Sequence, residues 1–281
     1  MTGTCPFGHV GPDAARDVPA PPELACPGCL GALVPADARE PVPSLACRRC
    51  AQVYSAEPGF VDFIGLAAPG AQGLGPRLMH SRVLAGIYER LWRPFFVAVA
   101  SGARPNFAEE LEQVLESLAP AAGGVVVDLS CGPGFTGRQL AHSRRFARVY
   151  GLDWSVPMLQ RALAADDPLF PLLRADVARL PFASGSLAGV HAGAALHMWP
   201  EPDSAIAEAA RALRSGGVLV ASTFAYPEQR LLRPLAEGFQ AISSARVFEV
   251  DELAGTCRAH GLVDFNAQRR GALVLFSATR A

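Results

Sequence analysis

Short apolar runs alternate with helical patterns between residues 106 and 223, and this alternation restricts the possible folds more than any other feature of the chain. Residues 124–129 form a continuous run rich in valine, which is typical of a strand buried on both faces of a sheet. A Gly-rich turn and a predicted helix over 135–144 follow this run. The same period recurs, so we predict an α/β fold with a doubly wound, mostly parallel sheet and right-handed crossovers.

Capping residues and the same period place further elements. Asn106, with Glu109 three residues later, is an Asx form of the capping box and predicts a helix that ends near Leu118. Ser155, with Pro157 in the first turn, predicts another helix start. Further strands are predicted at 147–152, 170–175, 187–192, 217–223 and 272–278, and further helices over 203–214 and after Asp251.

Composition excludes several classes of protein. Half of the 281 residues are hydrophobic, which is enough for one large domain and a small one. No stretch reaches about 18 uninterrupted apolar residues, so an integral membrane protein is not expected. A net charge of −1 gives no whole-chain electrostatic argument for nucleic-acid binding. The basic residues are all arginine, which excludes lysine Schiff-base and P-loop-lysine chemistry.

Charge divides the chain into zones. Residues 1–70 hold four arginines against seven acids, whereas residues 71–104 hold five arginines against one acid. We predict a flexible N-terminus over 1–23, a small unit over 24–70, a helical lid or linker over 71–104 and the α/β domain over 105–281. In the basic zone, we expect Arg90 or Arg93 to face the pocket; ordinary packing and an amphipathic surface for anionic lipid are the alternatives.

Four of the seven cysteines form two C-x-x-C pairs with 17 residues between them. Two such turns can place four thiolates around one tetrahedral Zn²⁺. A closed four-sulfur site has no open position, so the predicted role is structural and the predicted unit is a zinc ribbon. An odd cysteine count with paired C-x-x-C units favours metal binding in a reducing compartment. A redox pair and free thiols are the alternatives. The predicted ligands are Cys26, Cys29, Cys47 and Cys50.

The Gly-rich turn runs from Asp128 to Gly134 and joins the first buried strand to its helix. Glycines at Gly132 and Gly134 let the backbone approach a ligand closely, and the following helix start offers unpaired N–H groups. Continued to Gly137, the turn is a formal match to the dinucleotide fingerprint, which keeps a nicotinamide or flavin enzyme as an alternative.

Acids at three successive strand ends favour S-adenosylmethionine over a dinucleotide. Asp128 is placed to receive the ammonium group of that cofactor through water or an amide. Asp153 can accept both ribose hydroxyls, and Asp176 can accept the adenine amino group while the amide of Val177 meets a ring nitrogen. Asp153 as a cap before Ser155, and Asp176 as an exposed loop residue, are the structural alternatives.

Residues 124–223 resemble class I S-adenosylmethionine-dependent methyltransferases in the runs VVVDLSCGPG, GLDWS, RADVARLPF and RALRSGG. More narrowly, VHAGAALHMWP and the cysteine pairs resemble plant and algal plastid methyltransferases that are similar to ubiquinone/menaquinone methylases. The resemblance covers residues 24–281. It implies a seven-stranded sheet with an antiparallel final strand, and residence in plastids, with lipid droplets as one candidate surface. The predicted cofactor residues are Asp128, Ser130, Cys131, Gly132, Gly134, Asp153, Trp154, Asp176 and Val177.

The chain departs from that family at two places. Ser130 replaces the first glycine of the Asp-x-Gly-x-Gly-x-Gly motif, so we expect its φ to stay below zero. The first 25 residues carry only Arg16 against three acids, and no transit peptide is visible in them, so a cytoplasmic location is the alternative to plastids.

Two histidines are candidates for a base. His191 ends the fourth strand and His197 follows six residues later, and an imidazole can deprotonate a phenol or enol near neutral pH. Either histidine packed as a structural residue is the alternative. Trp199 is a candidate wall of the acceptor pocket, or a core residue.

The predicted function is methyl transfer from S-adenosylmethionine to a small apolar acceptor such as a quinone, a phenol or a lipid-like molecule. A ribosomal RNA base methyltransferase with a zinc-binding N-terminal domain is the first alternative. A catalytically silent zinc-ribbon scaffold and a nicotinamide oxidoreductase are the others. The sequence leaves the oligomeric state open, and peripheral contact with a membrane is compatible with it.

Overall fold

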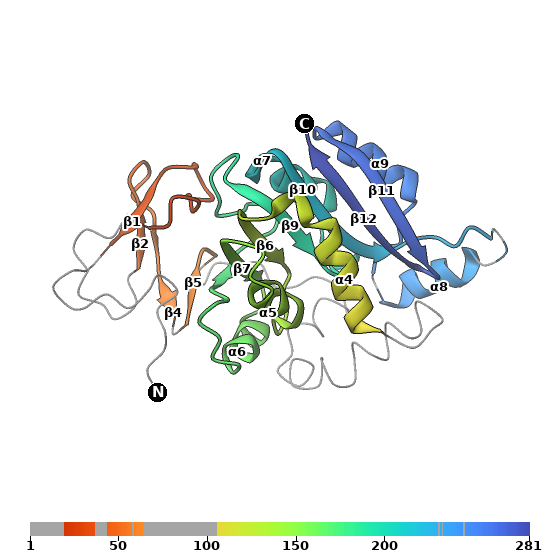
Figure 1. Ribbon diagram of the computed structural model, residues 1–281, viewed down its shortest axis with the longest axis horizontal. Helices are drawn as coiled ribbons and strands as arrows, with labels where there is room; N and C mark the ends of the chain where they lie inside the picture. The colour runs from red at the N-terminus through yellow and green to blue at the C-terminus, as the bar shows by residue number, and fades with distance from the viewer. Residues whose placement is uncertain are drawn as a thin grey trace.

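The computed structural model describes residues 20–36, 44–57, 59–64, 106–229, 231, 233–243 and 245–281. Most of the predicted N-terminus and the whole predicted lid, with Arg90 and Arg93, lie outside these described residues. Figure 1 shows a central sheet with helices packed on it, and a smaller N-terminal part at one end. None of the described helices is both long enough and apolar enough to span a membrane.

Nine strands form the central sheet within the described residues. They are β4 (Ala56–Glu57), β5 (Phe60–Asp62), β6 (Val125–Leu129), β7 (Arg148–Asp153), β8 (Leu172–Arg174), β9 (Leu187–Ala192), β10 (Leu213–Phe224), β11 (Leu262–Arg270) and β12 (Leu273–Arg280). Their order is β11-β12-β10-β9-β6-β7-β8-β5-β4. The strands from β10 to β8 are parallel, while β12 runs antiparallel between β10 and β11. The doubly wound, mostly parallel sheet and its antiparallel final strand are confirmed.

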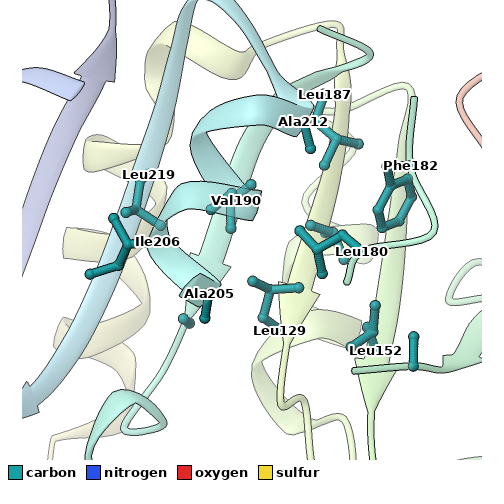
Figure 2. Packing of buried hydrophobic residues seen from close by; sticks show 14 of the residues in the cluster. Leu129, Leu152, Leu180, Phe182, Leu187, Val190, Ala205, Ile206, Ala212 and Leu219 are labelled. Atoms are coloured by element: carbon teal, nitrogen blue, oxygen red, sulfur yellow. The ribbon is translucent and has the colours of Figure 1, made fainter. Parts of the chain in front are cut away.

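Helices cover both faces of this sheet, and alternate residues of the strands separate the two cores. They are α4 (Phe107–Ser117), η2 (Ala119–Ala121), α5 (Phe135–His142), α6 (Val156–Leu163), η3 (Leu196–Met198), α7 (Pro202–Ala212), α8 (Arg233–Ser243) and α9 (Val250–Ala259). Val126 packs in one cluster with residues of α4, α5 and α6, whereas Val127 packs in the other with residues of α7 and α9. Figure 2 shows the second cluster, where Ala205 and Ile206 belong to α7 and Leu129 and Val190 to the sheet.

The capping predictions are confirmed where the signal is local. Asn106 is the N-cap of α4 and its side chain accepts from the Glu109 N–H at 3.3 Å. Ser155 is the N-cap of α6 and its hydroxyl accepts from the Met158 N–H at 3.5 Å. Each bond satisfies one of the N–H groups that a helix start leaves without a partner.

The N-terminal segment divides between two sheets. Its strands β1 (Leu33–Pro35), β2 (Leu45–Cys47) and β3 (Val53–Tyr54) form a small antiparallel sheet. The strands β4 and β5 instead extend the central sheet, because β5 pairs in parallel with β8. Seven strands from β11 to β8 match the predicted seven, and the N-terminal segment adds two more. The parallel pairing also gives β8 a neighbour on the side that would otherwise be an open edge.

Candidate functional site

The Gly-rich turn follows β6 with a left-handed backbone at three positions. The φ angles are 53° at Ser130, 55° at Gly132 and 82° at Gly134. The expectation of a negative φ at Ser130 is therefore wrong. A side chain in this region crowds the backbone, which is why glycine is favoured there. The Trp199 indole donates a hydrogen bond to the Ser130 hydroxyl at 2.9 Å. This bond fixes the side chain of the serine that stands where the family motif has glycine.

Asp153 joins the Gly-rich turn to the end of β7. Its Oδ2 accepts from the Gly132 N–H at 2.8 Å and its Oδ1 from the Ser155 N–H at 2.7 Å. The carboxylate is buried, and burial raises its pKa to about 6. A carboxylate offers about four lone-pair sites, so two backbone bonds leave capacity for ligand hydroxyls. The capping role and the ribose role therefore do not exclude each other.

The space beside the turn suits a ligand. A Cβ at Gly132 would meet no atom within 4 Å, whereas a Cβ at Gly134 would come to 2.8 Å from the Phe170 ring. Gly132 therefore faces open space and Gly134 permits close packing. The turn leads directly into α5, whose first N–H groups are suited to an anionic or polar ligand group.

Asp128 and His191 form a buried pair at the carboxyl ends of two neighbouring strands. They lie opposite each other on β6 and β9, and His191 Nδ1 lies 2.7 Å from Asp128 Oδ1. Each side chain is less than 5% exposed. An ionised carboxylate only accepts hydrogen bonds, so this pairing places the neutral ring's proton on Nδ1 and the lone pair on Nε2. A Cβ at Gly193 would come to 3.3 Å from Nε2, so glycine at this position leaves room beside that nitrogen.

His197 lies in a different environment from His191. It is buried in η3, its ring makes an edge contact with Phe224 at a centroid distance of 4.4 Å, and burial lowers its pKa to about 3. Such an imidazole is a weak base. The structure thus brings His191 next to a predicted cofactor acid and packs His197 against Phe224.

Asp176 and Val177 begin the loop that connects β8 to β9. The Asp176 side chain accepts from the Ala178 N–H at 2.9 Å. The end of β8 lies beside the end of β7, because Asp153 and Arg174 are register partners. Asp176 and Asp153 therefore both lie at the carboxyl ends of neighbouring parallel strands.

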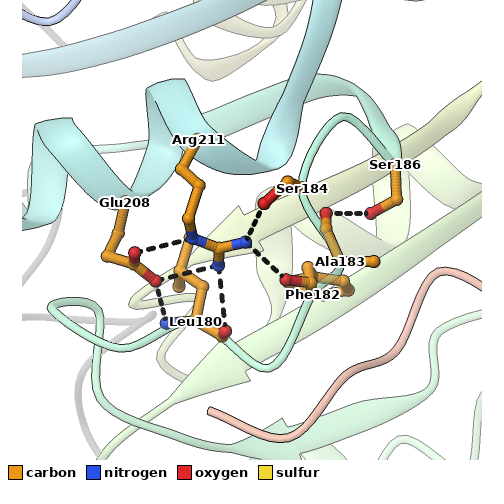
Figure 3. A network of polar contacts seen from close by, with 7 residues as sticks. All are labelled: Leu180, Phe182, Ala183, Ser184, Ser186, Glu208 and Arg211. Carbon is orange, nitrogen blue, oxygen red and sulfur yellow. Dashed lines mark hydrogen bonds and ion pairs between the residues drawn. The ribbon is translucent and has the colours of Figure 1, made fainter. Parts of the chain in front are cut away.

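The rest of this loop is held by hydrogen bonds to two side chains of α7. Arg211 donates to the carbonyl oxygens of Phe182 at 2.8 Å and Leu180 at 3.3 Å, while Glu208 accepts from the Leu180 N–H at 2.8 Å. Figure 3 shows this network and the Ser184 hydroxyl that also receives a bond from Arg211. Several hydrogen bonds to one guanidinium hold an otherwise irregular segment in a single path.

Cys131 precedes Gly132 and Trp154 follows Asp153, so both flank the hydrogen bond between Gly132 and Asp153. The Cys131 N–H donates to the Leu152 carbonyl at 3.0 Å. Burial raises the pKa of the Cys131 thiol well above its usual range, so the sulfur is protonated at neutral pH. The Trp154 carbonyl accepts from Arg174 Nε at 3.1 Å.

The four predicted metal ligands meet in the N-terminal segment. Their sulfur atoms lie within 4.8 Å of one another, with Cys29 to Cys47 at 3.4 Å and Cys26 to Cys50 at 3.7 Å. A tetrahedron with Zn–S bonds of about 2.3 Å would separate its sulfurs by about 3.8 Å. The Tyr54 hydroxyl lies 3.0 Å from the Cys26 sulfur, and the Arg49 N–H donates to Cys47. The spacing and the outer hydrogen bonds fit a bound Zn²⁺.

Sequence reasoning missed the residues that attach the N-terminal segment to the α/β domain. Arg174 contacts Asp62 at 2.7 Å across 112 residues, and the Tyr150 hydroxyl donates to Glu23 at 2.9 Å across 127 residues. No local pattern links residues so far apart. The only available signal was Asp62 itself, a carboxylate inside the apolar run FVDF.

Comparisons with known proteins agree with this geometry. The methyltransferase domain family matches residues 127–221. A chloroplastic methyltransferase of Arabidopsis thaliana is 37% identical over 283 residues, which cover 92% of this chain and 78% of the relative. The demethylmenaquinone methyltransferase of Clavibacter sepedonicus is 35% identical over 120 residues, 42% of this chain and 48% of that protein.

A solved structure shares the fold. The Haemonchus contortus phosphoethanolamine N-methyltransferase 2 in complex with S-adenosyl-L-methionine superposes with a TM-score of 0.61 at 14% identity, over 76% of this chain and 60% of that chain. The sheet order, the site at the strand ends and the extensive match to the Arabidopsis protein lead to one conclusion. The chain belongs to the family of that chloroplastic protein and is a class I S-adenosylmethionine-dependent methyltransferase.

Proposed function

We propose that the protein methylates a hydroxyl of a small apolar acceptor, such as a quinol, a phenol or a phenolic lipid, and that it does so in plastids. The buried Asp128–His191 pair carries this proposal, because an oriented neutral imidazole suits an acceptor whose proton must be removed near neutral pH. The chloroplastic Arabidopsis relative supports the compartment, and the demethylmenaquinone methyltransferase supports the acceptor class.

Bound S-adenosylmethionine supplies an electrophilic methyl group on a sulfonium sulfur. Asp153 would accept the ribose hydroxyls, and Asp176 with the Val177 amide would receive the adenine. The turn from Ser130 through Cys131 and Gly132 to Gly134 would hold the methionine part, and Trp154 would contact the ribose. The strand ends and the turn that bring these residues together support these assignments. Correct placement of donor and acceptor supplies most of the rate acceleration in such a transfer.

His191 acts as the base in this proposal. Its Nε2 takes the hydroxyl proton of the acceptor, while Nδ1–H stays bonded to Asp128, which stabilises the imidazolium that forms. The bound cofactor would supply its methyl group to the acceptor oxygen. The electron pair of the cleaved C–S bond would stay on sulfur, which would give S-adenosylhomocysteine. His191 then returns its proton to water.

The proposed Asp128 role adds orientation of His191 to the role predicted from sequence. A carboxylate that is bonded to His191 orients the base, and its remaining lone pairs can receive the cofactor ammonium group through water. We further infer that Cys26, Cys29, Cys47 and Cys50 hold a structural Zn²⁺, which supplies folding free energy and no chemistry.

The test is methyl transfer from radiolabelled S-adenosylmethionine to a panel of demethylated quinols, phenols and ribosomal RNA. His191→Asn keeps a side-chain donor for Asp128 but cannot take a proton, so we expect turnover of a quinol or phenol to fall by about 10²- to 10⁴-fold. His142→Asn is the matched control, because it alters a His–Asp pair of 2.8 Å on the surface. Full activity in His191→Asn, or labelling of RNA alone, would refute the proposal.

A further inference from the structure

The N-terminal segment is attached to the part of the domain that carries the adenosine half of the proposed cofactor site. Val61 pairs with Leu173, and the Phe63 N–H donates to the Arg174 carbonyl at 2.8 Å. Figure 1 shows β5 on the side of the central sheet that carries β7. The segment therefore pairs with β8, the strand that leads into Asp176.

A second contact joins the segment to the loop between β8 and β9. The Ala25 N–H donates to the Pro181 carbonyl at 3.0 Å, and the Ala183 N–H donates to the Glu23 carbonyl at 2.9 Å. This loop is the one that Arg211 holds from the other side. The cysteine ligand Cys26 follows immediately after Ala25, so the metal site and the loop are linked through one residue.

The metal site and the sheet also share a single hydrophobic core. Cys26 and Cys47 are buried in the same cluster as Leu152 of β7 and Leu173 of β8. Close-packed interiors transmit a displacement from one wall to the other. The cysteines and the strand that ends in Asp153 therefore belong to one continuous core.

One guanidinium completes the connection. Arg174 donates from one nitrogen to Asp62 Oδ2 at 2.7 Å and from Nε to the Trp154 carbonyl at 3.1 Å. The side chains of Arg174 and Asp62 are only 14% and 8% exposed. Trp154 directly follows Asp153, whose Oδ1 accepts from Ser155 on the other side of Trp154. Arg174 thus spans from the N-terminal segment to the turn that presents the ribose-binding carboxylate.

We propose that Arg174 is a positioning residue for cofactor binding, and that Asp62 makes its position depend on the docked, metal-loaded N-terminal segment. This inference rests on the proposed cofactor site at Asp153. The planar guanidinium holds two acceptors in fixed directions, so the ion pair with Asp62 orients the bond that Arg174 donates to the Trp154 carbonyl. Metal retention and cofactor binding are then coupled, and the coupling is reciprocal.

The direct test is calorimetric titration of the full-length, zinc-quantified protein with S-adenosylhomocysteine. Asp62→Asn removes the charge but keeps an oxygen for the Ile64 N–H, which donates to Asp62 Oδ1 at 2.8 Å. We expect its affinity to fall at least about fivefold, the lower end of typical coupling between sites. Asp62→Glu restores the charge and should recover part of the loss.

Glu23→Gln is the matched control at the same interface. It neutralises a carboxylate that accepts from Arg148 at 3.0 Å and from the Tyr150 hydroxyl. Both of these partners lie on β7, away from the Trp154 turn. We expect it to bind S-adenosylhomocysteine like the wild type. An equal loss in Glu23→Gln and Asp62→Asn would overturn the positioning role, because docking alone would then explain both.

Zinc release provides a second readout that does not use activity. Saturating S-adenosylhomocysteine should slow the transfer of zinc from the wild-type protein to a colorimetric chelator by about fivefold or more, and this protection should shrink in Asp62→Asn. Unchanged release would overturn the coupling. Wild-type protein that binds no S-adenosylhomocysteine would refute the cofactor site itself, whereas equal binding by wild type and Asp62→Asn would refute only this inference.

Discussion

The serine in the Gly-rich turn gives a prediction whose sign depends on two opposing effects. Ser130 has a φ of 53°, a conformation that costs a non-glycine residue about 1–2 kcal/mol. Its hydroxyl accepts from the Trp199 indole at 2.9 Å, and such a bond contributes about 0.5–1.5 kcal/mol net. Ser130→Ala keeps the strained backbone and loses the bond, so we expect it to be about 1 kcal/mol less stable than the wild type.

Ser130→Gly loses the same bond but relieves the strained backbone. Glycine also gives more freedom to the unfolded chain, which costs about 0.5–1 kcal/mol. The balance should make Ser130→Gly about 0.5–1 kcal/mol more stable than Ser130→Ala. Removing the indole N–H that donates to this hydroxyl, in Trp199→Phe, should reduce the cost of Ser130→Ala to a few tenths of a kcal/mol.

Urea denaturation of the zinc-loaded protein, with the slope of the transition compared across variants, measures these differences. An alanine variant that is as stable as the glycine variant would refute the backbone-strain argument. A cost of Ser130→Ala that is the same with and without the indole donor would refute the argument from the hydrogen bond.

Three further predictions follow from the site. Burial raises the pKa of Asp153 to about 6, so the affinity for S-adenosylhomocysteine should fall as the pH drops through 6. The ligand-free protein should instead become more stable as the pH drops from about 6 to 4, because the native state binds that proton more readily than the unfolded chain. Calorimetry and melting at pH 5 and 7.5 test both signs, and pH-independent affinity would contradict the ribose role. Cys47→Ser should abolish stoichiometric zinc, measured by metal analysis; retained zinc would exclude the four-sulfur site. Gly193→Ala should lower turnover while preserving cofactor affinity, because its Cβ would come to 2.9 Å from the His191 ring; unchanged turnover would argue against His191 as the base.

Local sequence signals predicted the centre of the fold well. The run at 124–129 and the Gly-rich turn became β6 and the start of α5, within a residue or two. These elements depend on neighbouring residues, so a short window contains the information. The helix over 203–214 is α7 at Pro202–Ala212, and the last strand is β12.

Non-local pairing was not predictable in the same way. β11 was missed because polar residues interrupt its sequence LVDFNAQRR and only Leu262 in this strand is buried. β5 was assigned to the zinc unit because nothing near Phe60 indicates that its partner is β8. Strand pairing is decided by what packs on the sheet, which a single window does not contain.

The two histidines illustrate the same limit at the site. Both follow or end a predicted strand and differ little in sequence context. The structure separates them by their partners, since His191 meets Asp128 while His197 meets Phe224. A partner 63 residues away decides the chemistry of His191.

The parallel pairing of β5 with β8 has a consequence for the order in which the protein assembles. The metal ligands span only 24 residues, so the cysteine cluster closes a short loop and can take up zinc early in synthesis. The docking partner of Asp62 emerges from the ribosome 112 residues later. Until then Phe60 and Val61 can pair with β4 but not with β8. The N-terminal segment is therefore the first part of the described chain to be made, yet β5 cannot join the central sheet until β8 has been made.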